Sequence, residues 1–486
     1  MITVQVRFGM LFSVAALVAV AESSTRGDIV KYRLPRSNRE LILQGSVQTN
    51  PGGTRTFNHP KLGTLHFNLD DSTIIKVPTL PEQFSRQLGK AGADANKRYE
   101  AAQWALRHGL LSSFYQAVEK TLEADPNHAR ANMVKKLKAR MDSPLGDSTQ
   151  QEKELKDLVG RPDMTIKMSK HFILMHDTPS KPFEGRKIPR ADERLLLLEQ
   201  VYESFLLRFF ASGVELEIPK DRLKVLLFSE HKDYLFFATK LDPSLSSAAG
   251  FWSPTSNTSV FYDNGTTEEF KHLLDLSANL QELKAVVVRK RVGGAADIRH
   301  LADSLKFLIG MERENLDVKV VSHETTHQMA GNTGLLPRDV RVPAWVHEGL
   351  ATYFETSEGA NWGGIGAVNE DRLNWYRALE PDKEHSNIDF IVGDQIFDYA
   401  GSHASTVHGY GQAWALTHFL MERHFDEFIA FYRRLGEMPP EVQFSQATLT
   451  TVFNECIKKD RRALDIEWRS YMRGLKTDLD IILNER

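Results

Sequence analysis

His323, Glu324 and His327 have the types and the spacing that metal chemistry needs, because together they form an H-E-x-x-H motif. Two histidines at positions i and i+4 of a helix project from the same face one turn apart, so they can bind one metal ion. The glutamate between them would lie beside the metal, where it can accept a proton from a bound water molecule. The motif is short enough to occur by chance, so its surroundings must decide.

The residues around the motif predict that it lies on an inward-facing helix. Apolar residues and the two histidines fall on one stripe with a period of about 3.6 residues, which is typical of a half-buried helix. The stripe consists of Leu316, Val320, His323, His327 and Ala330. Residues 331–334, Gly-Asn-Thr-Gly, then predict the end of the helix. The alternative is a pair of hydrogen-bonded histidines buried in the core.

A second predicted helix, running from Pro343 to about Glu355, offers the remaining ligand. Zinc bound by two histidines and a glutamate takes its third ligand from such a neighbouring helix and keeps a fourth position open for water. We expect Glu348 to be that ligand, although the helix dipole alone also favours a carboxylate in the first turn. The adjacent His347 projects about 100° away around the helix, so only one of the two can face the metal. Four residues share one face of this helix: Trp345, Glu348, Thr352 and Glu355.

The two segments together resemble the gluzincin peptidases, whose pattern is H-E-x-x-H, a short spacer, and W-x-x-E-G-x-A-x-Y. Here the second segment reads Trp345-Val-His-Glu348-Gly-Leu-Ala-Thr-Tyr353-Phe-Glu355. The resemblance implies that the zinc ligands are His323, His327 and Glu348, and it favours Glu348 over His347. It implies that Glu324 is the general base and that Glu355 is a supporting carboxylate. The overall likeness is to a family of secreted bacterial proteins with a peptidase-MA-like domain.

Two other classes of metallopeptidase do not fit the sequence. A metzincin needs H-E-x-x-H-x-x-G-x-x-H, and this chain has Ala330 at the glycine position and Thr333 at the third histidine position. The aminopeptidase branch of the gluzincins carries a G-x-M-E-N segment, and no such segment precedes His323. The absence of this segment weakens an aminopeptidase assignment and does not indicate which other branch applies.

Tyr410 is the candidate for stabilising a negatively charged reaction intermediate. Gluzincins place a Tyr or His from a C-terminal lobe opposite the metal, and the segment from His408 to Ala415 resembles the start of the helix that carries it. We expect the Tyr410 hydroxyl to donate to the oxyanion, with His408 as the second choice. The alternative is that Tyr410 only packs at the start of a helix.

The order of predicted elements indicates an α+β protein of several parts. The first part after the N-terminus is β-rich (22–80), and a helical segment resembling one tetratricopeptide hairpin follows (81–141). A polar stretch predicts a linker (142–163), and the resemblance implies a zincin-like domain for 164–486. That domain should contain a mixed sheet, the helix of the motif and an all-α C-terminal lobe. A hairpin within 250–262 is the candidate edge strand for pairing with an extended substrate, although a covered strand is an equal alternative.

Composition and the N-terminus indicate an exported protein. The apolar run Met10–Ala21 follows Arg7 and ends in Ala19-Val20-Ala21, which is typical of a signal peptide (1–21) cleaved after Ala21. No later stretch is long enough for a membrane span. A formal charge of −3 with mixed signs gives no indication of nucleic-acid binding. The single cysteine, Cys456, cannot form an intramolecular disulfide, and we expect it to be a core residue.

These observations predict a secreted or periplasmic zinc metallopeptidase that acts on a peptide or protein substrate. The alternative is a catalytically inactive zincin-like protein that binds a protein or a cell-surface polymer. A purely structural zinc site fits less well, because such sites are usually closed by four Cys or His ligands and have no use for Glu324. The sequence leaves the substrate specificity and the oligomeric state open.

Overall fold

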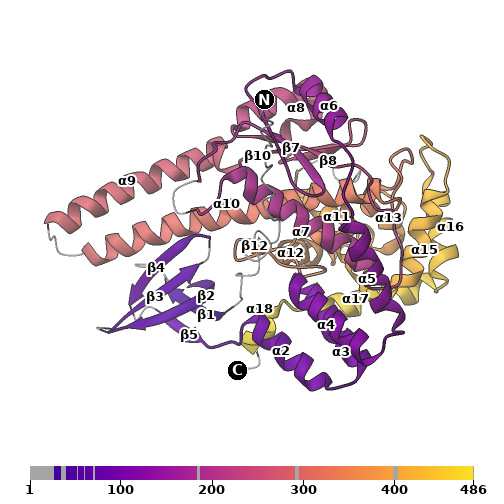
Figure 1. Ribbon diagram of the computed structural model, residues 1–486, viewed down its shortest axis with the longest axis horizontal. Coiled ribbons are helices and arrows are strands. Elements are labelled where there is room, and N and C mark those ends of the chain that lie inside the picture. Colours follow the sequence, from indigo (N-terminus) through magenta and orange to yellow (C-terminus); the bar gives the residue numbers. More distant parts are fainter. Residues whose placement is uncertain are drawn as a thin grey trace, which may run out of the picture.

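The computed structural model describes residues 27–33, 40–51, 53–59, 61–68, 72–182, 186–290, 295–397 and 403–484. The predicted signal peptide, 1–21, lies outside these residues. Of the described residues, 59% are helical and 14% lie in strands, so the predicted α+β class is confirmed (Figure 1). None of the described helices combines the length and the apolar composition that are needed to cross a bilayer.

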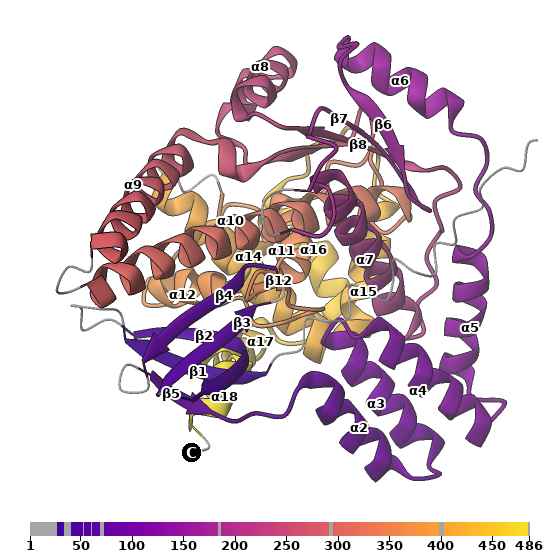
Figure 2. The same cartoon turned by 60° about the vertical axis from the view of Figure 1, so that its left-hand side comes forward.

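The predicted N-terminal β-rich part is confirmed, and the structure shows that it is a five-stranded antiparallel sheet. Its strands have the order β4-β3-β2-β1-β5. They are β1 (Asp28–Arg33), β2 (Glu40–Asn50), β3 (Thr54–His59), β4 (Gly63–Asn68) and β5 (Ser72–Ile75). The buried side chains of this sheet, including Tyr32 and Phe57, pack against Phe307 on the helix that carries the motif. The sheet therefore packs against that helix and supports it (Figure 2).

The helical segment that follows is larger than the single hairpin expected from the sequence. It contains α2 (Leu80–Ala91), α3 (Ala95–Arg107), α4 (Leu111–Ala124) and α5 (Ala129–Met141). The predicted hairpin is α3–α4, which turns at Gly109 with a φ of 70°. Buried side chains of α2–α5 belong to the same continuous hydrophobic core as three later helices, α7 (Arg190–Phe210), α11 (Ala344–Phe354) and α14 (His403–Arg423). The segment is thus packed onto the rest of the chain.

The stretch expected to be a linker, 142–163, contains a helix, which corrects that part of the domain prediction. Helix α6 (Thr149–Val159) ends at Gly160, a left-handed residue with a φ of 65°. Its one fully buried side chain, Leu155, packs into the core on one face of the second sheet. A polar surface helix needs only such a narrow apolar face, so its composition resembles that of a linker.

The second sheet has the order β6-β7-β8-β10-β9, with the three central strands parallel and both edge strands antiparallel. Its strands are β6 (Thr165–Met168), β7 (Phe172–His176), β8 (Leu223–Phe228), β9 (Phe251–Ser253) and β10 (Thr258–Tyr262). One face packs on α7 (Arg190–Phe210), and the other packs on α6 and α8 (His231–Leu241). The predicted hairpin is β9–β10, and β9 lies at the edge of this sheet.

The helix that carries the motif, α10 (Ala295–Asn332), is 38 residues long and begins well before the predicted stripe. Its first half pairs with α9 (Glu268–Lys290) in a projecting helical hairpin (Figure 1). Its second half lies under β9 and β10 and packs against α7 and α11 (Ala344–Phe354).

The region after α11 is helical apart from a small hairpin, β11 (Ser357–Glu358) and β12 (Asn361–Trp362), as the sequence predicts. Helices α12 (Glu370–Leu379) and α14 (His403–Arg423) pack together, and α14 also packs along α11. The remaining helices are α13 (Ile388–Val392), α15 (Phe425–Gly436), α16 (Gln446–Ile457), α17 (Arg461–Gly474) and α18 (Asp478–Asn484). This arrangement brings α12 and α14 to the two histidines of α10.

Candidate metal centre

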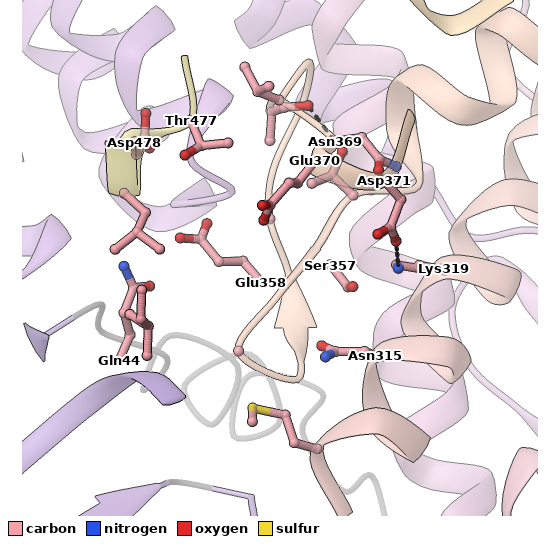
Figure 3. Close-up of a pocket in the computed structure, with 18 of the residues that line it drawn as sticks. Gln44, Asn315, Lys319, Ser357, Glu358, Asn369, Glu370, Asp371, Thr477 and Asp478 are labelled. Atoms are coloured by element: carbon pink, nitrogen blue, oxygen red, sulfur yellow. Dashed lines mark hydrogen bonds and ion pairs between the residues drawn. The ribbon is translucent and has the colours of Figure 1, made fainter. Parts of the chain in front are cut away.

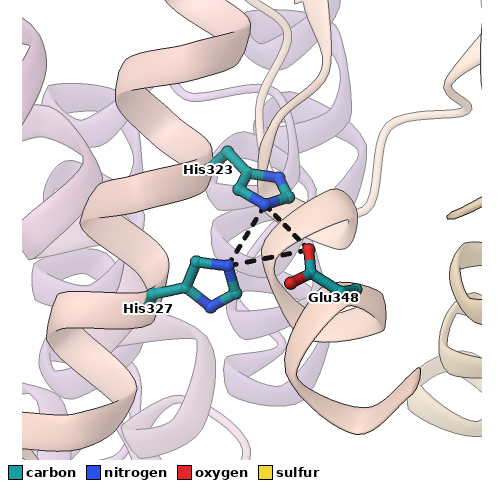
Figure 4. Close-up of side chains that lie close together, drawn as sticks. All are labelled: His323, His327 and Glu348. Carbon is teal, nitrogen blue, oxygen red and sulfur yellow. Dashed lines mark hydrogen bonds and ion pairs between the residues drawn. The ribbon is translucent and has the colours of Figure 1, made fainter. Parts of the chain in front are cut away.

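His323, His327 and Glu348 converge on one point between α10 and α11 (Figure 4). The Nε2 atoms of the two histidines are 3.1 Å apart. Oε2 of Glu348 lies 3.0 Å from Nε2 of His323 and 3.7 Å from Nε2 of His327. Ligand atoms bound tetrahedrally to zinc lie roughly 3.3 Å from one another. Two imidazole nitrogens and a carboxylate oxygen at these separations could together hold a metal ion.

Glu355 holds the imidazole of His323 from the side opposite the cluster. Nδ1–H of His323 donates to Oε2 of Glu355 over 2.8 Å, which leaves Nε2 free to act as a ligand. Asn369 and Arg372, at the start of α12, donate to the other oxygen of Glu355 over 3.0 Å and 2.7 Å. Although burial raises the pKa of Glu355, the charge of Arg372 and the hydrogen bond from His323 lower it to about 2. Glu355 is therefore ionised, as a carboxylate that supports a ligand must be.

The protonation of the cluster follows from its mixed charges. Burial lowers the pKa of His323, but hydrogen bonds with Glu348 and Glu355 outweigh burial and raise the pKa to about 10. Burial raises the pKa of Glu348, yet the charges and hydrogen bonds of His327 and His323 hold it well below its usual value. A divalent cation would replace the proton shared by these groups, so its binding should release protons.

We expect Glu355→Gln to weaken zinc binding without removing the ligands. The amide keeps the shape of the side chain but loses the charge that orients His323 Nδ1–H, so the zinc dissociation constant should rise roughly 10- to 100-fold. Competition with a chromogenic chelator measures this constant. Glu370→Gln, at an exposed carboxylate on α12, is the matched control and should bind as the wild type does. Equal affinities for both variants would contradict a supporting role for Glu355.

Glu324 lies on α10, the helix that also carries His323 and His327, and it faces the edge strand β9. Burial raises the pKa of its carboxyl, and the nearby His323 and His327 partly oppose this rise. The backbone of Trp252, on β9, also lowers this pKa. A glutamate whose pKa is raised towards neutrality is suited to accept and return a proton.

Two close approaches hold β9 against α10. A Cβ atom on Gly250 would lie 2.6 Å from Cγ1 of Val320, and a Cβ atom on Gly331 would lie 2.6 Å from Cη2 of Trp252. Glycine at both positions thus lets the edge strand sit directly on the helix. The outer edge of the sheet is therefore fixed beside Glu324.

The structure brings Glu348, and not His347, to the two imidazoles. The ring centroid of His347 is 5.6 Å from that of His327. Burial, with a contribution from His327, lowers the pKa of His347 to about 4, so its side chain is neutral. Of the residues that the structure describes, the only group of three His, Cys, Asp or Glu side chains placed to hold a metal ion is His323, His327 and Glu348.

Tyr410 enters the site from α14. Its ring centroid is 6.2 Å from that of His323, and the guanidinium of Arg372 lies 4.9 Å from the centre of the Tyr410 ring. The charge of Glu348 and burial both raise the pKa of Tyr410. The hydroxyl therefore stays protonated and can donate a hydrogen bond. The second choice, His408, packs its ring against Trp375 instead.

Arg372 and Asn369 belong to the site but were not predicted from the sequence. Asn369 caps α12, since its side chain accepts from the backbone N–H of Arg372. The run Asn369-Glu370-Asp371 before an apolar segment is a recognisable signal for the start of a helix. Nothing in that signal indicates that the start of the helix contacts Glu355.

A separate cavity of about 580 Å³ lies where the N-terminal sheet, α10, the segment after α11 and the start of α18 meet (Figure 3). Its polar lining includes the ion pair between Lys319 and Asp371, with Nζ 2.5 Å from Oδ2. Asn369 also lines it, so this residue links the cavity to Glu355.

Comparisons with known proteins give one match. A family described as a protein of unknown function, DUF1570, matches residues 317–441, about a quarter of the chain. The matched region contains the cluster, Glu324, Glu355, Arg372 and Tyr410. No curated protein and no solved structure matches the chain.

Proposed function

We propose that the chain is a zinc-dependent peptidase of the gluzincin type with a zincin-like catalytic region. The observation that carries this proposal is the convergence of His323 and His327 with Glu348, beside a glutamate that is not itself a member of the cluster. Zinc bound there would lower the pKa of water towards about 7 and polarise a peptide carbonyl. A closed structural site would have no role for Glu324 next to its ligands.

Other residues of the chain would supply the proton transfer, the oxyanion contact and the substrate contacts. Glu324 accepts a proton from the attacking water on its carboxylate and later delivers it to the departing amine. The Tyr410 hydroxyl donates a hydrogen bond to the oxyanion that forms from the peptide carbonyl. Strand β9 is an edge strand next to Glu324, so it offers backbone groups that can pair with an extended peptide. Peptide-library cleavage by the wild type, compared with Glu324→Gln, tests the function.

We also propose that the protein is exported. The support is the sequence alone: the apolar run Met10–Ala21 ends in a small-residue cleavage signature. Cleavage after Ala21 would leave Glu22 as the first residue of the secreted or periplasmic chain. N-terminal sequencing of the exported protein checks this, and a retained Met1 would contradict it.

We expect Tyr410→Phe to lower kcat on the order of 10²–10³-fold, because its hydrogen bond forms mainly in the transition state. KM and zinc content should change little, since the hydroxyl is not a ligand. Steady-state kinetics on a cleaved peptide measure the effect. Tyr115→Phe removes a hydroxyl on α4 that donates to Glu203, and it serves as the control. If Tyr410→Phe retains the wild-type kcat, His408→Ala is the next variant to measure.

A further inference from the structure

Helix α9 lies on the outer side of the projecting hairpin in both views (Figures 1 and 2). It is 23 residues long, which corresponds to about 35 Å. It packs along α10 and against the short 3₁₀ turn before it. Helix α9 carries none of the residues of the metal centre, and the proposed peptidase chemistry makes no use of it.

The face of α9 that meets α10 follows a seven-residue repeat. Phe270 and Ser277 are buried seven residues apart, and Lys284, seven residues further, pairs with Asp303 of α10. Val287 is buried in the last turn. This is the spacing of two helices packed as a coiled coil, in which one narrow apolar seam is enough.

Helix α9 carries more apolar surface than that seam can cover. Six of its large apolar side chains are exposed, and all of them except Leu273 lie outside the seam: Leu273, Leu274, Leu276, Leu283, Val286 and Val288. Apolar residues at the positions beside a seam are typical of helices that contact more than one other helix. The hairpin therefore has the pattern of half of a larger helical bundle.

One flank of α9 is complementary to itself. Glu269, Leu276, Leu283 and Lys290 are spaced by seven residues and form one line along the helix, which we name the α9 stripe. Leu276 is 50% exposed and Leu283 is 45% exposed, and both end residues are exposed. If two copies run antiparallel, Glu269 meets Lys290 of the partner subunit and Leu276 meets Leu283 of the partner subunit. A two-fold axis satisfies both contacts twice.

We propose that the α9 stripe is the interface of a symmetric dimer of this chain, in which two hairpins form an antiparallel four-helix bundle. The acidic first turn and the basic last turn of α9 give this orientation charge complementarity, which a parallel pairing would lack. The interface is small, so the dimer should be reversible, with a Kd on the order of micromolar. This proposal is independent of the metal centre and of the proposed activity.

Sedimentation equilibrium of the full chain tests the apolar half of the stripe. In the dimer, Leu276→Glu/Leu283→Glu would bury four carboxylates without partners, so the Kd should rise on the order of 100-fold or more. Leu241→Glu is the matched control, because Leu241 is 48% exposed on α8, outside the hairpin. Zinc content and circular dichroism should be unchanged in both variants, which shows that the fold is intact.

A charge-reversal experiment tests the orientation. Glu269→Lys alone and Lys290→Glu alone place like charges opposite each other, so each should dimerise roughly tenfold more weakly at low salt. An equimolar mixture of the two variants restores both opposite-charge pairs and should form a heterodimer. The double reversal in one chain should dimerise as the wild type does.

Three results would overturn the proposal. One is a full chain that stays monomeric at about 100 μM, a concentration well above the expected Kd. Another is a dimer that Leu276→Glu/Leu283→Glu leaves unchanged, which would locate the interface elsewhere. The third is a monomeric chain that binds phosphatidylglycerol vesicles through the stripe, which would make α9 a lipid-binding helix.

Discussion

Glu324→Gln is expected to bind zinc as tightly as the wild type and to lose turnover on the order of 10²–10⁴-fold. The amide cannot accept the proton of the attacking water, and that is the contribution general base catalysis makes. Zinc should stay because Glu324 is not one of the three converging side chains. Cleavage of a peptide library, followed by mass spectrometry, and zinc content by elemental analysis measure the two quantities together.

The control for this variant is Glu312→Gln, because Glu312 is an exposed glutamate on the same helix. It should leave both quantities unchanged. Full activity in Glu324→Gln would show that the general base is another group. A wild-type protein that binds zinc but cleaves no peptide in the library would instead support the alternative of a zincin-like binding protein.

His323→Ala is expected to abolish stoichiometric zinc binding, and His327→Ala should do the same. Each removal leaves two ligands from a set of three, and a catalytic zinc site needs three protein ligands to hold the ion. The wild type should contain about one zinc per chain. The same loss is expected for Glu348→Ala, because its carboxylate closes the triangle with the two imidazoles.

The neighbouring His347→Ala provides the matched control for the third ligand. Its ring lies beside His327 outside the cluster, so this variant should keep its zinc. A protein that loses zinc in His347→Ala but keeps it in Glu348→Ala would reverse the assignment. Full retention of zinc when His323 and His327 are both replaced would exclude the site altogether.

The sequence predicted the side chains of the cluster because each comes from a local pattern. His323 and His327 share a helical face by their spacing alone, and Glu348 shares a face with Glu355 on a short second helix. The contacts of Glu355 with Arg372 and Asn369 depend on how α12 packs against α11, over loops whose path no local pattern determines. That part of the site required the structure.

The full length of α10 was not predicted from the sequence. Near the start of the apolar stripe, two inward positions of α10 are the buried carboxylates Glu314 and Asp317. Arg190 of α7 lies 3.2 Å from Glu314, and Arg194 lies 3.1 Å from Asp317. These ion pairs compensate the burial of the carboxylates. The predicted apolar stripe begins at Leu316, whereas the helix itself begins at Ala295.

The strands and the hairpin of the second sheet were predictable because their residues form clear apolar runs. Phe172–His176 and Leu223–Phe228 are almost wholly apolar runs, as expected of parallel strands covered on both faces. The position of β9 at the edge of the sheet follows from strand order, which depends on crossovers between distant segments. The sequence could propose the edge but not decide between an open and a covered strand.

The most direct test of the central claim is a zinc titration of the chelator-treated full chain, with bound zinc and peptide cleavage measured on the same samples. The structure predicts that both rise together and level off at one zinc per chain, and that Glu324→Gln follows the zinc curve without the activity. Cleavage that persists in the chelated protein, or zinc binding unaffected by loss of His323, would contradict the assignment of this cluster as a catalytic metal centre.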